Sequence, residues 1–243
     1  GLQPMQLEVA ERVVAHFAPR YTCVSFAHRG FAPSDAIDGG PDPADYAGDL
    51  AALIDHLKFT DVRLVGQSMG GWTVLEYAIT NPTRVKALVL SSTSGTIDRR
   101  SADPSGGDRY DSWLKDAEAQ IVAGLAHGIH PAVGARAAER SPSLHLLYKS
   151  IDEMAGPLDK EKLRDNLRRT ARRRTSDLKD FRVPTLLIAG GRDVVFPPFL
   201  ASAIAATLPC ADAQEMPESG HSPYFEDAAT FNQLVERFLA LHA

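Results

Sequence analysis

The chain has 243 residues, of which 44% are hydrophobic and 23% are charged, as in an ordinary folded globular domain. This length is long for one domain and short for two, so we expect a single domain with an inserted subdomain. The formal net charge of -5 argues against a nucleic-acid-binding protein, because that class usually carries an excess of basic residues.

The sequence also argues against a membrane protein and against a disulfide-rich one. No apolar run approaches the roughly 20 residues that a bilayer-spanning helix needs, and no secretory signal stands at the start. We therefore expect a cytoplasmic protein without a membrane partner. Cys23 and Cys210 lie far apart in apolar runs, so we expect buried, inert thiols rather than a disulfide or a zinc site.

In chain order, the first 90 residues alternate between helical periodicity and short buried runs. Helices are expected over residues 7–17, 45–57 and 72–80, and strands over residues 21–26, 62–65 and 85–90. Such alternation favours an α/β fold with a mostly parallel sheet flanked by helices.

The pattern then changes and later returns. Residues 91–109 are expected to form a loop, and residues 110–174 show roughly four helical patterns without a clear strand. Alternation resumes with expected strands at 185–189 and 213–216 and helices at 198–206 and 224–241. We therefore divide the chain into a core (1–94 and 181–243) and an all-helical insertion (95–180) that is placed to act as a cap.

The strongest chemical signal is the pentapeptide Gly66-Gln-Ser68-Met-Gly70, which stands between a buried strand and an amphipathic helix. A sharp strand-to-helix turn exposes a serine oxygen, and the glycines allow the close backbone approach that the turn requires. Ser68 is therefore a candidate nucleophile.

A serine needs a base, and the base needs a carboxylate that orients it. His221 lies in a polar loop between an expected strand and the last helix, and Asp193 directly follows a buried strand. Both positions are typical of catalytic residues in parallel α/β sheets. His28 and His130, which are loop residues, could border the pocket, whereas the other five histidines fall on helical patterns or at the chain end: His16, His56, His127, His145 and His242.

These segments together resemble the α/β-hydrolase fold family over nearly the whole chain. The resemblance rests on the pentapeptide and on three further motifs in the family's order, which begin at Arg29, Pro184 and Gly220. It implies that Ser68 is the nucleophile, His221 the acid and base, and Asp193 the orienting acid. It also implies that the Met69 N–H is one oxyanion donor and that the insertion covers the pocket.

The start of the chain departs from this family. Similar members begin with strands that end in a His-Gly turn, and here no such strands precede Leu7. If Gly1 is the glycine of that turn, Leu2 would be the second oxyanion donor. The absent strands imply that a homodimer partner or another segment supplies the missing pairing, that the sheet closes differently, or that the chain is partial.

Aromatic residues near the motifs are candidates for a substrate pocket. The candidates are Phe31, Phe196, Trp72 and Tyr224, and for each of them a place in the core is about as plausible. The basic stretch from Lys160 to Arg182 could bind nucleic acid or direct an arginine at an acidic substrate, but Leu163 and Leu167 favour a solvated helix face.

We therefore expect a serine hydrolase that cleaves carboxylic esters of a small-molecule substrate through an acyl-enzyme. Two alternatives remain open: a hydrolase of carbon–carbon bonds in ring-cleavage products, and a degenerate, ligand-binding protein without turnover. No metal-ligand spacing, phosphate-binding loop or dinucleotide fingerprint occurs in the sequence, so we expect neither a metal nor a cofactor.

Overall fold

The computed structural model describes most of the chain, namely residues 10–31, 33–35, 42–153, 165–166, 169–170 and 172–242.

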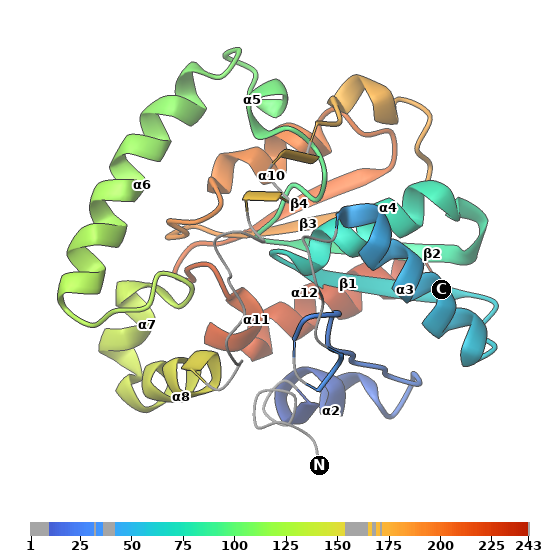
Figure 1. Ribbon diagram of the computed structural model, residues 1–243, viewed down its shortest axis with the longest axis horizontal. Coiled ribbons are helices and arrows are strands. Elements are labelled where there is room, and N and C mark those ends of the chain that lie inside the picture. The colour runs from blue at the N-terminus through green and yellow to red at the C-terminus, as the bar shows by residue number, and fades with distance from the viewer. Residues whose placement is uncertain are drawn as a thin grey trace.

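A parallel sheet of four strands forms the centre of the molecule (Figure 1). Its strands lie in the order β1 (Val62–Gln67), β2 (Val85–Ser91), β3 (Thr185–Gly190) and β4 (Ala211–Met216). All three neighbouring pairs are parallel, which agrees with the expected α/β class. Their carboxyl ends therefore share one edge, where the loops that carry the candidate site residues begin.

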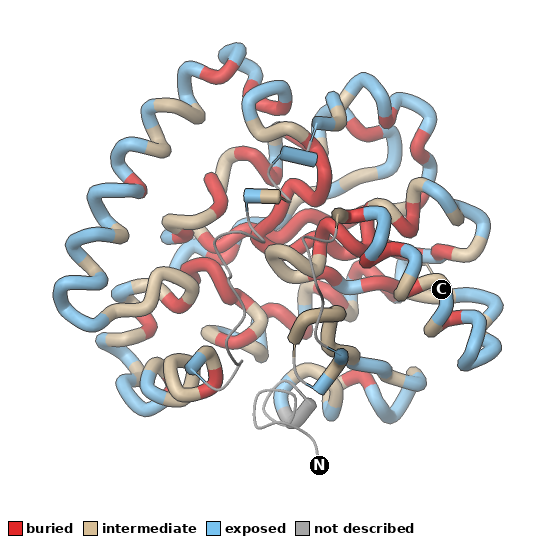
Figure 2. The backbone as a smooth tube through the Cα atoms, in the orientation of Figure 1, coloured by how far each residue is buried: buried red, intermediate tan, exposed pale blue. Residues whose placement is uncertain are grey.

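Helices cover both faces of this sheet because successive strand side chains point to opposite faces. Leu88 and Leu90 pack in a core beneath α3 (Pro43–His56), α4 (Gly70–Thr80) and α10 (Pro198–Ala205). Ala87 and Val89 pack in a second core on the other face. The elements over that face are η1 (Ala10–Val14), α2 (Ala15–Phe17) and α12 (Ala228–Leu241). The buried residues in Figure 2 accordingly concentrate along the strands and the inner sides of these helices.

Between β2 and β3, the described residues form helices joined by loops. It contains α5 (Arg99–Ala102), α6 (Asp108–Ala126), α7 (Gly134–Arg140), α8 (Pro142–Glu153) and η3 (Thr175–Leu178). The helix α5 corrects the expected loop over 91–109, since the Asp98 side chain caps it by accepting the Arg100 N–H. The long helix α6 runs along the periphery of the molecule (Figure 1). Among the described residues, no helix combines the length and apolarity needed to cross a bilayer.

Capping side chains set several helix ends that periodicity does not locate. The helix expected at 45–57 begins at Pro43, because Asp42 and Asp45 form a reciprocal capping box at its start. The closing helix expected over 224–241 is two helices, α11 (Pro223–Glu226) and α12. Asp227 separates them and caps α12 by accepting the Thr230 N–H. Of the helix expected at 7–17, residues 7–9 lie outside the described part.

The strand expected at 21–26 is not a strand, which corrects the sequence analysis. Tyr21 and Cys23 pack against the core beneath α12, whereas Phe26 packs against the core beneath α4. The segment thus lies level with the sheet and its side chains alternate as in a strand. It forms no ladder with β1, and within the described residues β1 pairs on one side only. Val65 in β1 is 47% exposed.

The two cysteines are free, and neither is fully buried. Cys210 is exposed because it lies in the turn before β4, which corrects the expected buried thiol. Cys23 is half-buried in the unpaired segment, and burial raises the pKa of its thiol.

Candidate active site

Ser68 lies at the sharp turn between β1 and α4. Its φ of 50° is in the left-handed region, which a non-glycine residue adopts only where its surroundings enforce it. Its N–H donates to the Ser91 carbonyl at 2.9 Å, which ties the turn to the end of β2. A Cβ on Gly66 would lie 2.8 Å from the Gly70 carbonyl oxygen, and a Cβ on Gly71 would lie 2.2 Å from Thr93 Cγ2. The glycines are therefore required by close packing around Ser68, which is half-buried.

His221 lies in the loop between β4 and α11 and is buried. Its Nδ1 is 2.8 Å from Asp193 Oδ2, and its Nε2 is 2.8 Å from Ser68 Oγ. A carboxylate only accepts hydrogen bonds, so Nδ1 carries the ring proton and Nε2 accepts from the Ser68 hydroxyl. The three residues, which are far apart in the sequence, form one continuous hydrogen-bonded chain.

Asp193 follows β3 and is 3% exposed. Its Oδ1 accepts the N–H groups of Val195 at 2.7 Å and Phe196 at 2.9 Å, which leaves Oδ2 for His221. The carboxylate thus stabilises its own turn and is oriented by it.

This turn also explains why one expected pocket residue is not at the pocket surface. Phe196 is fully buried in the core beneath α4, because the two bonds to Asp193 fold the chain inward at this position. Its ring lies under the Arg99 guanidinium, 5.4 Å away. We therefore correct the expectation that Phe196 lines an accessible pocket.

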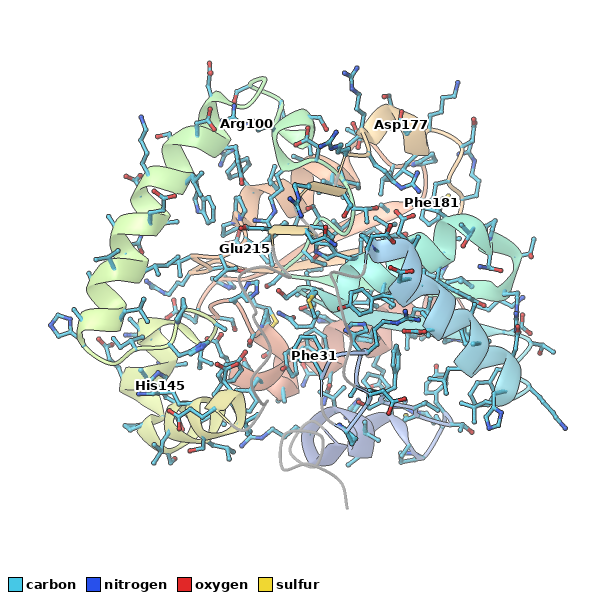
Figure 3. All side chains as sticks on the ribbon, viewed as in Figure 1. Phe31, Arg100, His145, Asp177, Phe181 and Glu215 are labelled. Carbon is cyan, nitrogen blue, oxygen red and sulfur yellow. The ribbon has the colours of Figure 1, made fainter. Side chains whose placement is uncertain are left out.

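The other candidate aromatic residues lie in two places. Trp72 is buried at the start of α4 in a small cluster with Tyr46, and Phe31 and Met69 pack against this cluster. Phe31 is labelled in Figure 3, near the middle of the molecule. Tyr224 follows the His221 loop and packs against the core beneath α12, where burial raises the pKa of its hydroxyl.

Of the two candidate oxyanion donors, Met69 lies within the described residues. Met69 precedes α4, and within the described part of the chain its N–H is not bonded to any acceptor. That amide is therefore available to a ligand. Leu2 lies outside the described residues.

The two loop histidines have separate environments, and neither is hydrogen-bonded to Ser68, His221 or Asp193. His28 bonds Thr73 Oγ1 at 2.9 Å and contacts the Tyr46 ring, and burial lowers its pKa to about 4. His130 lies in the insertion, where its N–H donates to Nε2 of His145 on α8, labelled in Figure 3. His28 is thus a neutral, packed side chain at physiological pH.

Two polar residues that the sequence analysis gave no role contact the His221 loop. Gln67 donates to the His221 carbonyl at 2.6 Å, and the Glu226 carboxylate accepts the N–H groups on either side of His221. Both residues stand inside motifs already singled out, at the second position of the pentapeptide and five residues after His221. Only the folded structure shows that they meet the same loop.

One arginine of the basic stretch has a specific structural partner. Arg173 forms a bidentate ion pair with Glu76 on α4, at 2.6 and 2.7 Å. Burial alone would raise the pKa of Glu76, but the bonds from Arg173 and Thr96 bring it below its ordinary value. Leu163 and Leu167, which favoured a solvated helix face, lie outside the described residues.

Comparison with known proteins places the chain among proteins of similar architecture. The model of the alpha/beta hydrolase fold family matches residues 4–228. "Putative non-heme bromoperoxidase BpoC" of Mycobacterium tuberculosis is 28% identical over 239 residues, which cover 94% of this chain and 87% of that protein.

Solved structures are similar to this chain in their fold. A thermophilic esterase from Thermogutta terrifontis superposes with a TM-score of 0.73 and 23% identity, over 99% of this chain and 86% of that one. An esterase from Exiguobacterium antarcticum gives a TM-score of 0.72 and 22% identity, over 97% and 87% of the two chains.

Proposed function

Since this chain belongs to the alpha/beta hydrolase fold family, we propose that it is a serine hydrolase that cleaves carboxylic esters. The observation that carries the proposal is the hydrogen-bonded chain from Ser68 through His221 to Asp193, with 2.8 Å at each link. It supplies a nucleophile, a base within reach of it and a buried acid that orients the base.

In the proposed reaction Ser68 Oγ attacks the ester carbonyl while His221 Nε2 takes its proton. Asp193 stabilises the imidazolium that forms and stays ionised. His221 then protonates the departing alkoxide, which leaves an acyl group on Ser68. A water molecule then gives a proton to His221 as it attacks the acyl carbonyl. The bond from the acyl carbon to Ser68 Oγ breaks, the carboxylic acid leaves, and His221 returns the proton to Ser68 Oγ.

The negative charge on the tetrahedral oxygen needs N–H donors. The Met69 N–H is the first proposed donor, because it has no acceptor in the described part of the chain and the helix dipole of α4 favours negative charge there. Leu2 remains the proposed second donor. Loss of one such donor typically lowers the rate about 10²- to 10³-fold, so completion of this hole governs activity.

We place the acyl pocket beside the helical insertion, which then serves as a cap. Phe31, Trp72 and Tyr224 are the proposed apolar contacts, since they lie next to the Arg29 motif, the nucleophile turn and the His221 loop. The insertion contacts the His221 loop directly, because Gly134 at the start of α7 packs against Gly220. The proposed contacts are apolar, which suits a neutral ester.

The activities named for similar structures favour esters as the first substrates to try. Those from Thermogutta terrifontis and Exiguobacterium antarcticum are described as esterases, and one from Burkholderia xenovorans as an enol-lactonase. All three are below 25% identical to this chain, so these activities guide only the choice of assay, and the proposal itself rests on Ser68, His221 and Asp193.

The test is hydrolysis of p-nitrophenyl acetate and butyrate, with fluorophosphonate labelling in parallel. Ser68→Ala should lose both turnover and labelling, while Ser202→Ala, an exposed serine on α10, should keep both. Labelling without turnover would redirect the search to carbon–carbon bond substrates. Absence of labelling in the unaltered chain, or equal turnover after Ser68→Ala, would overturn the proposal.

A further inference from the structure

The main chain around His221 is held on one side by a half-buried carboxylate. Glu226 Oε2 accepts the Gly220 N–H at 2.8 Å, and Glu226 Oε1 accepts the Ser222 N–H at 3.0 Å. The two donors are the N–H groups of the residues that flank His221 in the sequence. A single side chain therefore fixes the backbone immediately before and immediately after the histidine.

The same residue is held on its other side by the neighbour of the nucleophile. Gln67 Nε2 donates to the His221 carbonyl at 2.6 Å, and Ser91 Oγ donates to Gln67 Oε1 at 2.6 Å. Ser91 also accepts the Ser68 N–H through its carbonyl. The dipeptide Gln67-Ser68 thus bonds His221 twice, once through its ring and once through its main chain.

The bonds to the His221 main chain differ from the ring bonds because they need not change during the reaction. The Ser68–His221 bond must break when Ser68 attacks, so it cannot hold the ring in place throughout the reaction. A displacement of about 1 Å at such a site can cost about 100-fold in rate. An arrangement that keeps the His221 main chain fixed while the ring bonds change is therefore needed.

Glu226 occupies this position despite an unfavourable environment. Burial raises its pKa to about 7, and among the described residues no Lys, Arg or His forms an ion pair with it. Its partners are the two N–H groups of the His221 loop. A carboxylate kept in such surroundings is consistent with a role other than stability.

We propose that Glu226 and Gln67 are positioning residues that clamp the main chain of His221 from opposite sides and keep its ring aligned with Ser68 and Asp193. The inference rests on the proposed function, because alignment matters only if His221 acts as the base. Neither side chain touches the reacting atoms in this role.

The test compares Glu226→Gln and Gln67→Met with matched controls. Glu226→Gln keeps one acceptor oxygen and loses the other, and Gln67→Met keeps the length but loses the donor. Glu218→Gln removes a charge from the same loop, where Glu218 contacts arginine side chains, and Gln214→Met makes the second change on an exposed position of β4. Urea unfolding verifies that each variant folds.

The positioning role predicts a specific kinetic pattern. In each clamp variant kcat for p-nitrophenyl butyrate should fall about 10- to 100-fold while KM stays within about twofold. The fluorophosphonate labelling rate should fall in parallel, and both controls should behave as the unaltered chain. A kcat equal to that of the controls, or a rise in KM alone, would overturn the inference.

A spectroscopic signal separates this inference from the proposed function. The His221 Nδ1 proton, held by Asp193, should give a downfield NMR resonance that shifts or broadens in both clamp variants but not in the controls. This signal can be read even if the unaltered chain neither hydrolyses esters nor labels, an outcome that would defeat the proposed function alone. An unchanged resonance in folded Glu226→Gln and Gln67→Met would defeat the clamp.

Discussion

At the scale of single residues, the turns that bring Ser68 and His221 together are strained or closely packed. Ser68 keeps a positive φ, and strain of this kind costs on the order of 1–3 kcal/mol. Close backbone contacts around it leave no room for side chains at Gly66 and Gly71. Backbone contacts are equally close at the His221 loop, where Gly190 at the end of β3 lies against Gly220.

Gly190→Ala tests this contact. A Cβ at Gly190 would lie 1.9 Å from the Gly220 carbonyl oxygen, so the substitution must displace the loop that carries His221. We expect kcat to fall by about 100-fold or more and the free energy of unfolding by about 1–3 kcal/mol. Gly48→Ala in α3, where nothing lies within 4 Å, is the control and should stabilise by about 1 kcal/mol. Full activity in Gly190→Ala would show that the loop need not hold its position.

Glu226 gives a prediction for the pH dependence of stability. Its pKa is raised from 4.5 to about 7, so the folded state binds this proton more tightly than the unfolded state. The resulting stabilisation is present below about pH 4.5 and is lost as the pH rises through 7, and it amounts to on the order of 3 kcal/mol.

Glu226→Gln should remove this dependence. Urea unfolding of both chains at pH 5 and pH 8 should therefore show the variant gaining stability relative to the unaltered chain as the pH rises. The predicted combination at pH 8 is a relative gain in stability together with a loss of kcat. A stability difference that is the same at both pH values would contradict the raised pKa.

At the scale of elements, an ion pair joins the insertion to the helix that follows the nucleophile. Glu76 on α4 is held by Arg173, which lies where the chain returns from the insertion toward β3. Their side chains are 12% and 34% exposed, so removal of one partner leaves a poorly solvated charge. This contact fixes the return of the insertion against the core.

Arg173→Met should lower the free energy of unfolding by about 1–3 kcal/mol, because it strands the Glu76 carboxylate. Lys86→Met removes one partner of the exposed pair with Asp61 and should cost less than about 1 kcal/mol. Adding Glu76→Met to Arg173→Met should recover much of the loss. Equal costs for the Arg173 and Lys86 variants in urea unfolding would contradict the prediction.

Elements were predictable from the sequence where local pattern and tertiary packing agree. The buried runs that became β1, β2 and β3 have apolar residues suited to a sheet covered on both faces. Residues 21–26 have a similar pattern, but a strand also needs a hydrogen-bonded neighbour, and composition does not report that. The break at Asp227 depends on one capping bond, which periodicity cannot detect.

The residues of the candidate site also differ in whether the sequence could identify them. Ser68, Asp193 and His221 stand in motifs with recognisable turns, so the sequence could nominate them. Gln67 bonds the main chain of a segment 154 residues away, whereas Glu226 bonds N–H groups only six and four residues before it, and the sequence pattern does not report where either side chain points. Phe196 was misplaced because the direction of its ring follows from two hydrogen bonds to Asp193.

At the scale of the whole molecule, β1 is the edge of the sheet among the residues that the structure describes. Residues 21–26 continue the alternation of the sheet on both of its faces, yet they are not hydrogen-bonded to β1 in the described part of the chain. An exposed strand edge is a template for pairing with another strand. Two occupants fit the alternation: a strand of a second copy and another segment of the same polypeptide.

Hydrogen exchange of β1 (Val62–Gln67) distinguishes these occupants. If the edge is unpaired in a monomer, amides that point away from β2 exchange as fast as a loop at low protein concentration. If β1 pairs with a second copy, these amides should become protected as the protein concentration rises. Light scattering should show dimers over the same concentration range. The amides of β2, which pairs with β1 and β3, serve as the control and stay protected throughout. Concentration-independent protection in a monomer would show instead that the same polypeptide fills the edge, and fast exchange in a stable dimer would place the dimer contact elsewhere.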